Sequence, residues 1–127
     1  MKTIVLKFGG TSVGSVERIK KIAHIILYYK RKKNKIIVVS SAMSGVTNDL
    51  VKKSKLISNN FNKAEYDVLV SSGEQVACAL IAGRLNHLGY KSRSWMSWQI
   101  PILTDGPYAS ARINKIITKD LKKYLKL

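Results

Sequence analysis

Two short apolar runs, each followed by small polar residues, constrain the fold of this chain more than any other feature. The first covers residues 3–7 (TIVLK) and the second covers residues 35–40 (KIIVVS). Continuous runs of this length, rich in β-branched residues, are typical of strands that are buried on both faces of a parallel sheet. The two runs therefore predict two strands of a mainly parallel sheet.

The segment between the two runs has the periodicity of an amphipathic helix. From Ser15 onward its apolar residues are spaced three and four apart, at Val16, Ile19, Ile22, Ala23, Ile26 and Tyr29. Ser12 and Ser15 are both suitable N-caps for such a helix. The basic stretch YYKRKKNK at residues 28–35 suits the negative end of the helix dipole, and we interpret it as a solvated helix end.

The rest of the chain predicts two more helices, a third strand and a final helix. Thr47 or Asn48 is expected to cap a short helix that reaches about Leu56. A longer helix is expected over residues 64–88, interrupted near Ser71–Glu74 and ended by Gly89. A strand is predicted near residues 91–95, the segment WQIPILTDGPY is a strand or an extended loop, and residues 116–125 have helical periodicity.

This order of elements predicts one α/β domain with a mainly parallel sheet. A chain of 127 residues with 46% apolar residues can build a real core. The last helix should lead into a further strand, so its apolar face and one edge of the sheet are expected to lack partners.

Composition predicts a cytoplasmic protein. No apolar run approaches the roughly 20 residues that a membrane span needs, and no secretory signal follows Met1-Lys2. The single cysteine, Cys78, lies in an apolar helical run and is interpreted as a reduced core residue.

The net charge of +16 raises the question of a polyanionic partner. The chain has 18 lysines and only 5 arginines, whereas base-reading and bidentate phosphate sites favour arginine. Aromatic residues are not interleaved as in an RNA-binding sheet. These observations argue against nucleic acid as the main partner, although a non-catalytic basic binding module stays open as an alternative, and the charge would attract metabolites such as ATP.

The segment KFGGTS, residues 7–12, is the first candidate site. It lies where a strand turns into a helix, so glycine amides could approach a phosphate there while Lys7 supplies a mobile positive charge. The spacing is neither a Walker A loop nor GxGxxG. From spacing alone, a phosphate site and a tight structural turn fit equally well.

A second candidate is the small-residue loop from Ser40 to Asp49, since ligands of open α/β sheets gather at the carboxyl ends of strands. Taken alone, this loop fits a solvated turn better. A third candidate is Glu74, which fits either a helix-capping carboxylate or a partner for a substrate ammonium group.

The remaining polar and aromatic residues give weaker signals. Arg112 could bind a carboxylate or phosphate, but a surface salt bridge explains it better, and Gln99 gives no clear signal. His24 and His87 lack metal-ligand spacing, so no metal site is predicted. Trp95 and Trp98 are interpreted as core residues rather than as a cofactor platform.

Four ordered motifs resemble the amino-terminal part of the kinase domain of aspartokinases, which belong to the amino-acid kinase family. They are KFGGTSVGSVERI, VVSSAMSGVTNDL, LVSSGEQVACALIAGRLNHLG and SWQIPILTDGPYASARI, and they are distributed between residues 7 and 113 of the 127. The resemblance implies a three-layer αβα sandwich that transfers the γ-phosphoryl group of MgATP to the side-chain carboxylate of L-aspartate. In that family the product, 4-phospho-L-aspartate, leads to lysine, diaminopimelate, methionine and threonine.

The resemblance also implies residue roles. Lys7 would be the catalytic residue against the transferring phosphoryl group. The ATP phosphates would contact Lys7, Phe8, Gly9, Gly10 and Ser41. Aspartate would contact Gly45, Val46, Thr47, Asn48, Asp49 and Glu74, with Glu74 holding its ammonium group. Mg²⁺ would be held mainly through the ATP phosphates rather than by protein ligands.

This sequence departs from the family pattern in several ways. Ser97 replaces a glycine that often precedes Trp-Gln, and Tyr108 replaces a common histidine. The family's AGFQG-like and GRGGSD-like segments, its adenine-binding part and its two regulatory ACT domains have no counterpart in the sequence. The resemblance therefore implies half an active site and a chain that is inactive alone. It leaves open a homo-oligomer and a complementing carboxyl-terminal polypeptide that completes the enzyme.

Overall fold

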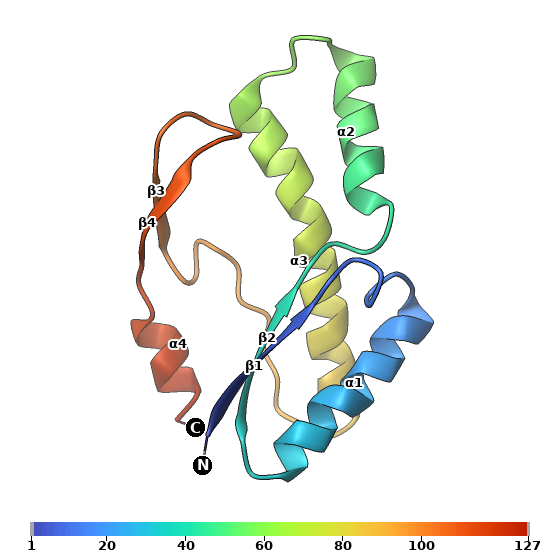
Figure 1. Cartoon of the computed structure of the whole chain (residues 1–127), viewed down its shortest axis with the longest axis vertical. Coiled ribbons are helices and arrows are strands. Elements are labelled where there is room, and N and C mark those ends of the chain that lie inside the picture. The colour runs from blue at the N-terminus through green and yellow to red at the C-terminus, as the bar shows by residue number, and fades with distance from the viewer. Residues whose placement is uncertain (1, 127) are drawn as a thin grey trace.

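The computed structural model describes residues 2–126, which form two small sheets and four helices (Figure 1). Along the chain the elements are β1 (Thr3–Phe8), α1 (Val16–Arg31), β2 (Lys35–Ser40), α2 (Val46–Ile57), α3 (Lys63–His87), β3 (Ile102–Asp105), β4 (Arg112–Ile116) and α4 (Lys119–Tyr124). The predicted α/β class, the first two strands and the helix between them are confirmed.

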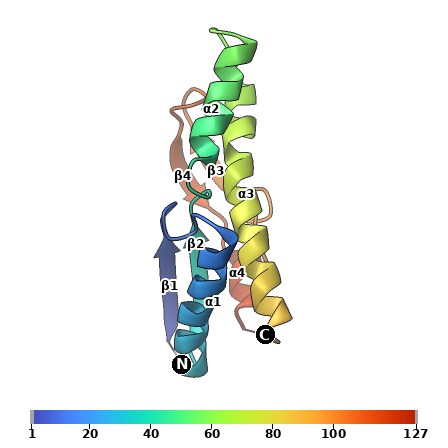
Figure 2. The same cartoon turned by 90° about the vertical axis from the view of Figure 1, so that its right-hand side faces the viewer.

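β1 and β2 form a parallel pair in which Leu6 lies opposite Val38. Alternate residues of the two strands pack against the core, where α1 and α3 lie (Figure 2). The other face is open in the described chain, since Val5 is 59% and Val39 is 48% exposed. The prediction that both faces are buried is therefore wrong for residues 2–126, because these residues supply helices to one face only.

The core contains four of the six residues that the helical periodicity singled out in α1, whereas Val16 is 46% exposed and Tyr29 is only partly buried. Ile19, Ile22 and Ile26 of α1 pack with Ile81 and Leu85 of α3, and the buried cluster is completed by Val13, Ala23 and Leu27. Burying an aliphatic side chain of this size contributes about 1.5–3 kcal/mol relative to leaving it exposed. These contacts hold α1 and α3 together on one face of the parallel strands.

Helix α1 begins at one of the two serines that could cap it. The Oγ of Ser15 accepts a hydrogen bond from the Arg18 amide at 3.2 Å, and Ser15 has extended backbone angles. Ser12 instead donates its amide to the Gly9 carbonyl at 3.0 Å. Ser15 is therefore the N-cap, and Ser12 belongs to the preceding turn.

Helix α3 runs without interruption through residues 71–74, so the predicted break is wrong. The Oγ atoms of Ser71 and Ser72 donate to the carbonyls of Val68 and Leu69 at 3.0 and 2.7 Å, so both hydroxyls are satisfied within the helix. By length and composition α3 could cross a membrane, with a mean hydropathy of 1.2. A single such helix is weak support for a span, and α3 packs against α1 and α2.

The chain after α3 differs from the prediction. Gly89 ends the helix with φ +82°, as predicted, and the Tyr90 amide donates to the Leu85 carbonyl at 3.0 Å. The predicted strand at residues 91–95 is wrong. The Ser92 amide donates to the Asn86 Oδ1 atom at 2.8 Å, and the Asn86 Nδ2 atom donates to the Ser92 carbonyl at 3.0 Å. In a strand, these backbone groups of Ser92 would pair with the backbone of a neighbouring strand.

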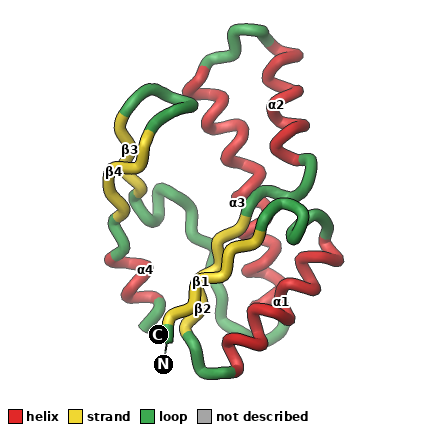
Figure 3. The backbone as a smooth tube through the Cα atoms, in the orientation of Figure 1, coloured by secondary structure: helices red, strands yellow, loops and turns green. Residues whose placement is uncertain are grey.

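Strands β3 and β4 form an antiparallel hairpin that is separate from the parallel pair (Figure 3). β3 lies within the segment that was expected to be a strand or an extended loop. Residues 112–116 form β4, so the predicted helix at residues 116–125 begins later and is shorter, as α4. Every residue of both hairpin strands is exposed, so little burial holds the hairpin in place.

Candidate active site

The loops that follow β1 and β2 meet at the carboxyl ends of the two strands. The Ser41 amide donates to the Phe8 carbonyl at 3.0 Å, which extends the pairing of the strands into the loops. A Cβ atom on Gly10 would lie 3.3 Å from the Ala42 carbonyl oxygen and 3.8 Å from the Ser41 hydroxyl. Gly10 does not adopt a positive φ, so close approach of the two loops is the reason for a glycine there.

The first loop is fixed by backbone hydrogen bonds and by one buried side chain. The Gly9 carbonyl accepts from the amides of Ser12 and Val13, at 3.0 and 3.2 Å. Val13 is fully buried, and the Arg18 guanidinium donates to the Thr11 carbonyl at 2.6 Å. The turn therefore has a defined structure that holds Gly10 and Thr11 against the second loop.

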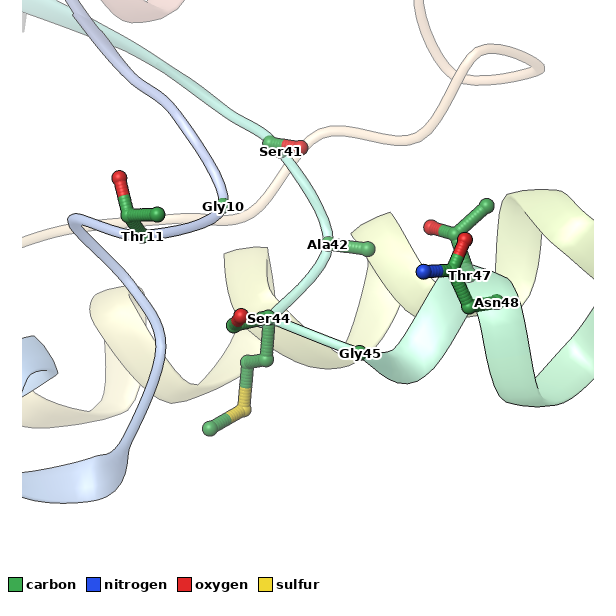
Figure 4. A pocket seen from close by; sticks show the side chains of 9 residues that line it. Gly10, Thr11, Ser41, Ala42, Ser44, Gly45, Thr47 and Asn48 are labelled. Carbon is green, nitrogen blue, oxygen red and sulfur yellow. The ribbon is translucent and has the colours of Figure 1, made fainter.

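A cavity of about 330 Å³ lies between the two loops and the start of α2 (Figure 4). Its wall consists of small residues, several with hydroxyl groups: Gly10, Thr11, Ser41, Ala42, Met43, Ser44, Gly45, Thr47 and Asn48. Backbone amides, hydroxyls and a helix N-terminus are the groups that bind phosphate or carboxylate oxygens. The cavity has the chemistry of an anion site.

The start of α2 lies at this cavity and has no side-chain cap. Gly45 occupies the N-cap position with φ +82°, a left-handed conformation that glycine adopts without strain. Thr47 and Asn48 lie in the first turn, so the prediction that one of them caps the helix is wrong. An uncapped first turn leaves amides available to a bound anion, and the helix dipole favours negative charge there.

Glu74 reaches the same region from α3. Its Oε1 atom accepts a long hydrogen bond, 3.4 Å, from the Ala42 amide in the middle of the second loop. Gly73, the preceding residue, is buried against this loop. The structure therefore brings together three segments that the sequence singled out separately: residues 9–12, residues 41–48 and Glu74.

Lys7 lies beside the cavity rather than in its wall. Its side chain is exposed on the open face of the sheet, and its Nζ atom lies 3.9 Å from the position of a Cβ on Gly9. An ammonium group on a flexible stem at this position can reach an anion held by the neighbouring amides. The Lys7 side chain thus adds a mobile positive charge at the end of β1.

The predicted site residues as a whole fall into two groups. Gly10, Ser41, Gly45, Thr47 and Asn48 line the cavity. Outside its wall lie Lys7, Phe8, Gly9, Val46, Asp49 and Glu74.

Three of these outer residues also have structural contacts. The Phe8 side chain packs against the core, Val46 contacts Gly73, and the Asp49 amide donates to Gly45. Four lining residues were not among the predicted site residues, namely Thr11, Ala42, Met43 and Ser44, although all lie in the two loops that the sequence singled out.

A smaller cavity of about 150 Å³ lies on the other side of Glu74. It is lined by Ser71, Glu74, Gln75, Cys78, Trp95, Met96, Ser97 and Trp98. Trp98 is 66% exposed, so its interpretation as a core residue is wrong, because the turn at residues 97–100 places it on the surface.

Cys78 is a free, half-buried thiol at this smaller cavity. Burial, and to a lesser extent the Glu74 carboxylate, raises the pKa of the Cys78 thiol. A thiol that keeps its proton is a poor nucleophile and a poor metal ligand. Glu74, rather than Cys78, is therefore the candidate functional side chain of this region.

Among residues 2–126, His, Cys, Asp and Glu side chains do not gather in groups of three that could hold a metal ion. The larger cavity offers hydroxyls and amides, which fit the phosphates of a nucleotide. A divalent cation would fit there only as a companion of those phosphates.

Fold and site together define a class: an α/β protein with a candidate anion site at the carboxyl ends of parallel strands. The sequence model of the amino acid kinase family matches residues 2–127, and the chain belongs to this family. Among its curated relatives is the "Aspartokinase" of Rickettsia felis, 49% identical over 100% of this chain and 32% of that protein. The "Aspartokinase" of Geobacillus stearothermophilus is 46% identical over 98% of this chain and 31% of its own length.

A solved structure gives the same result for the fold. The crystal structure of aspartate kinase from Synechocystis matches 68% of this chain and 15% of that chain, with a TM-score of 0.66 and 45% identity. The chain thus spans about a third of the length of the curated relatives that it matches. The resemblance to aspartokinases is confirmed.

Proposed function

We propose that the chain is the amino-terminal part of an aspartate kinase domain, which uses ATP to phosphorylate the side-chain carboxylate of L-aspartate. The product would be 4-phospho-L-aspartate, on the route to lysine, diaminopimelate, methionine and threonine. The observation that carries the proposal is the cavity where Gly10, Ser41 and the uncapped start of α2 meet. Its relatives named aspartokinase, 42–49% identical, support the choice of substrate.

The chemistry asks little of the protein beyond positioning and charge neutralisation. The nucleophile is a carboxylate that is already ionised at neutral pH, so no general base is needed. Lys7 would stabilise negative charge on the transferring phosphoryl group, while the amides of Gly9 and Gly10 and the Ser41 hydroxyl hold phosphate oxygens. Mg²⁺, bound mainly through the ATP phosphates, would neutralise part of their charge.

Aspartate would bind at the start of α2. The dipole of the uncapped first turn, with Thr47 and Asn48, suits a carboxylate, and Glu74 suits the ammonium group. The Glu74 carboxylate is half-buried and accepts a hydrogen bond from the amide of Ala42, which is a residue of the cavity wall. Val46 and Asp49 would contribute by shaping that turn, because their amides are bonded to the Met43 and Gly45 carbonyls and thereby hold Thr47 and Asn48 in place.

We further propose a cytoplasmic protein that is inactive as this chain alone. It would act with additional polypeptide, either in a homo-oligomer or with a complementing carboxyl-terminal partner. The open face and edges of the β1–β2 pair support this, because exposed Val5 and Val39 leave apolar surface for a further layer.

The test is acyl-phosphate formation from ATP and aspartate, trapped with hydroxylamine. The chain is assayed alone and after co-expression with the part of the Geobacillus stearothermophilus relative that it does not match. We expect turnover only in the combined sample, with Lys7→Ala and Glu74→Ala each lowering it at least 100-fold. Lys20→Ala, an exposed lysine of α1, is the matched control. Turnover by the isolated chain would contradict its inactivity, and near-normal turnover by Lys7→Ala would contradict the role of Lys7.

A non-catalytic basic binding module is a second candidate, favoured by the net charge of +16. Such a module would bind nucleic acid in a salt-sensitive manner and would lose little affinity in Lys7→Ala, because one lysine among 18 contributes little. Absence of binding to duplex DNA or single-stranded RNA at 150 mM salt would remove this candidate.

A further inference from the structure

Gly73 is buried on the face of α3 that contacts the second loop, and its surroundings explain why a glycine is found in a helix. A Cβ atom there would lie 2.9 Å from the Ala42 Cβ, 3.2 Å from the Val46 Cγ1 and 3.7 Å from the Leu50 Cδ1. Contacts between carbon atoms are normally about 3.5–4.0 Å, so a side chain at position 73 would displace the loop or the helix.

The two nearest of these atoms belong to residues in the cavity wall or next to it in the chain. Ala42 lines the cavity, and its Cβ is attached directly to the backbone, so it cannot rotate away. Val46 is the first residue of α2, whose first turn also lines the cavity. A larger residue at position 73 would therefore push on the two backbone segments that form the anion site.

Glu74 depends on the same approach. Its hydrogen bond from the Ala42 amide is already 3.4 Å long, and the strength of such a bond falls off beyond about 3.2 Å. Separating α3 from the loop by a few tenths of an ångström would take Glu74 out of hydrogen-bond range of Ala42.

We propose that Gly73 is a positioning residue: its missing side chain sets the separation of α3 from the 41–46 loop, and thereby places Glu74 at the Ala42 amide and fixes the wall of the cavity. The inference rests on the cavity being the site of the proposed function, but it concerns the arrangement of the loop itself. It can therefore be tested without enzymatic turnover.

Helix α3 contains a matched control for this proposal. Gly83 lies in the same helix, and a Cβ there would meet no atom within 4 Å. Replacing either glycine by alanine gains the same helix propensity, about 0.5–1 kcal/mol. Any difference between Gly73→Ala and Gly83→Ala therefore reports the contact with the loop and not the helix.

The experiment follows the backbone amide of Ala42 by NMR at constant pH when Glu74 is replaced by Gln. In the wild-type background and in Gly83→Ala, this replacement should shift the Ala42 amide resonance, because the carboxylate that accepts its hydrogen bond is replaced by a neutral carboxamide. We expect Gly73→Ala to reduce the shift at least twofold. An Ala42 response in Gly73→Ala equal to that of the wild type would overturn the proposal.

A second variant removes the other half of the contact. Ala42→Gly deletes the carbon atom that would lie 2.9 Å from the new side chain, so in Ala42→Gly/Gly73→Ala the amide of residue 42 should again respond to Glu74→Gln. If Gly73→Ala alone is unfolded, recovery of a folded spectrum by the double variant supports the proposal, and failure to recover overturns it. A negative kinase assay would not affect the interpretation of either NMR result, because neither measurement depends on turnover.

Discussion

At the scale of single residues, the glycines of this chain show two different physical reasons for the same amino acid. Gly45 has φ +82°, so a side chain there would be strained whatever the space around it. Gly10 and Gly73 have no such angle, and close approach of another segment excludes a side chain. A sequence shows that a glycine is present, but not which of these reasons applies, because the second depends on residues that are distant in the chain.

The Cys78 thiol gives a prediction about reactivity. Burial and the Glu74 carboxylate raise the pKa of Cys78, so less thiolate is present at pH 8 than in an ordinary cysteine. We expect alkylation by iodoacetamide at pH 8 to be slower in the folded chain than in the urea-denatured chain, with the rate rising at higher pH. The pKa of this thiol is higher in the folded chain than in the unfolded chain. The stability that this difference contributes is therefore fully present below the unfolded pKa and is lost as pH rises through the folded pKa.

Glu74→Gln provides the control for this measurement. It removes the smaller of the two causes, so the midpoint of the rate–pH profile should fall partway toward that of the denatured chain. A folded-state midpoint at or below the denatured value would show that the thiol is not held in its protonated form.

At the scale of elements, the N-terminus of α1 gives a prediction about stability. Ser15→Ala removes the hydroxyl that accepts from the Arg18 amide, and should lower the free energy of unfolding by about 1 kcal/mol. Ser12→Ala, three residues earlier, keeps the backbone hydrogen bond to Gly9 and should change it by less than about 0.5 kcal/mol. Urea denaturation of the two variants measures the difference, and equal losses would contradict the assignment of Ser15 as the cap.

The hairpin gives a prediction about local order. Asp67 of α3 accepts a hydrogen bond from the Ala109 amide at 3.0 Å, at the tip between β3 and β4. Since the strands themselves are exposed, Asp67→Ala should speed hydrogen exchange of the Ala109 amide roughly fivefold, the equivalent of about 1 kcal/mol. Glu65→Ala, a nearby exposed acid, is the control. Unchanged exchange at Ala109 would show that Asp67 does not hold the hairpin.

The elements that the sequence predicted well are those whose pattern is local. Strands β1 and β2 and helix α1 follow from runs and spacings of apolar residues, and their boundaries agree with the structure within a few residues. The predicted break near Ser71–Glu74 is wrong because the hydrogen bonds of a long helix tolerate one glycine, Gly73, that tertiary packing requires. Helix propensity is a weak guide where packing decides.

The region after Gly89 was harder to predict because partners decide its structure. The strand predicted at residues 91–95 is absent from the described chain, where the Asn86 side chain instead of another strand bonds to the Ser92 backbone. Residue 116, where the predicted helix begins, is instead the end of β4, whose residues 112–116 pair with β3. For the site, the two loops and Glu74 could be identified from the sequence. That all three come together at Ala42 could be seen only in the structure, because it depends on how α3 and the loops pack.

At the scale of the whole molecule, the open face of the parallel pair and the greater length of the relatives both favour the proposal that additional polypeptide packs on this sheet. Within residues 2–126, helices pack on one face of the strands, and the chain spans about a third of the length of the curated relatives that it matches. A parallel pair with Val5 and Val39 exposed is an incomplete layer by the usual rules of α/β folds. This is the physical basis for expecting that additional polypeptide completes the site.

The net charge of +16 gives a prediction about the whole chain. With 23 Lys and Arg residues against 7 Asp and Glu residues, folding brings like charges together, and this repulsion opposes the compact state. Salt screens it, since the Debye length falls from about 30 Å at 0.01 M to about 3 Å at 1 M. We expect the melting temperature to rise by about 4 °C or more between 10 mM and 500 mM sodium chloride, which corresponds to roughly 1 kcal/mol for a chain of this size.

Two comparisons separate this charge effect from a general effect of the solvent. Sucrose stabilises compact states without screening charge, so it should raise the melting temperature of every variant equally. Lys20→Gln/Lys53→Gln, which removes two exposed charges, should start from a higher melting temperature at low salt and gain less from added salt than the wild type. An identical salt response in the two chains would mean that repulsion among these lysines does not limit stability.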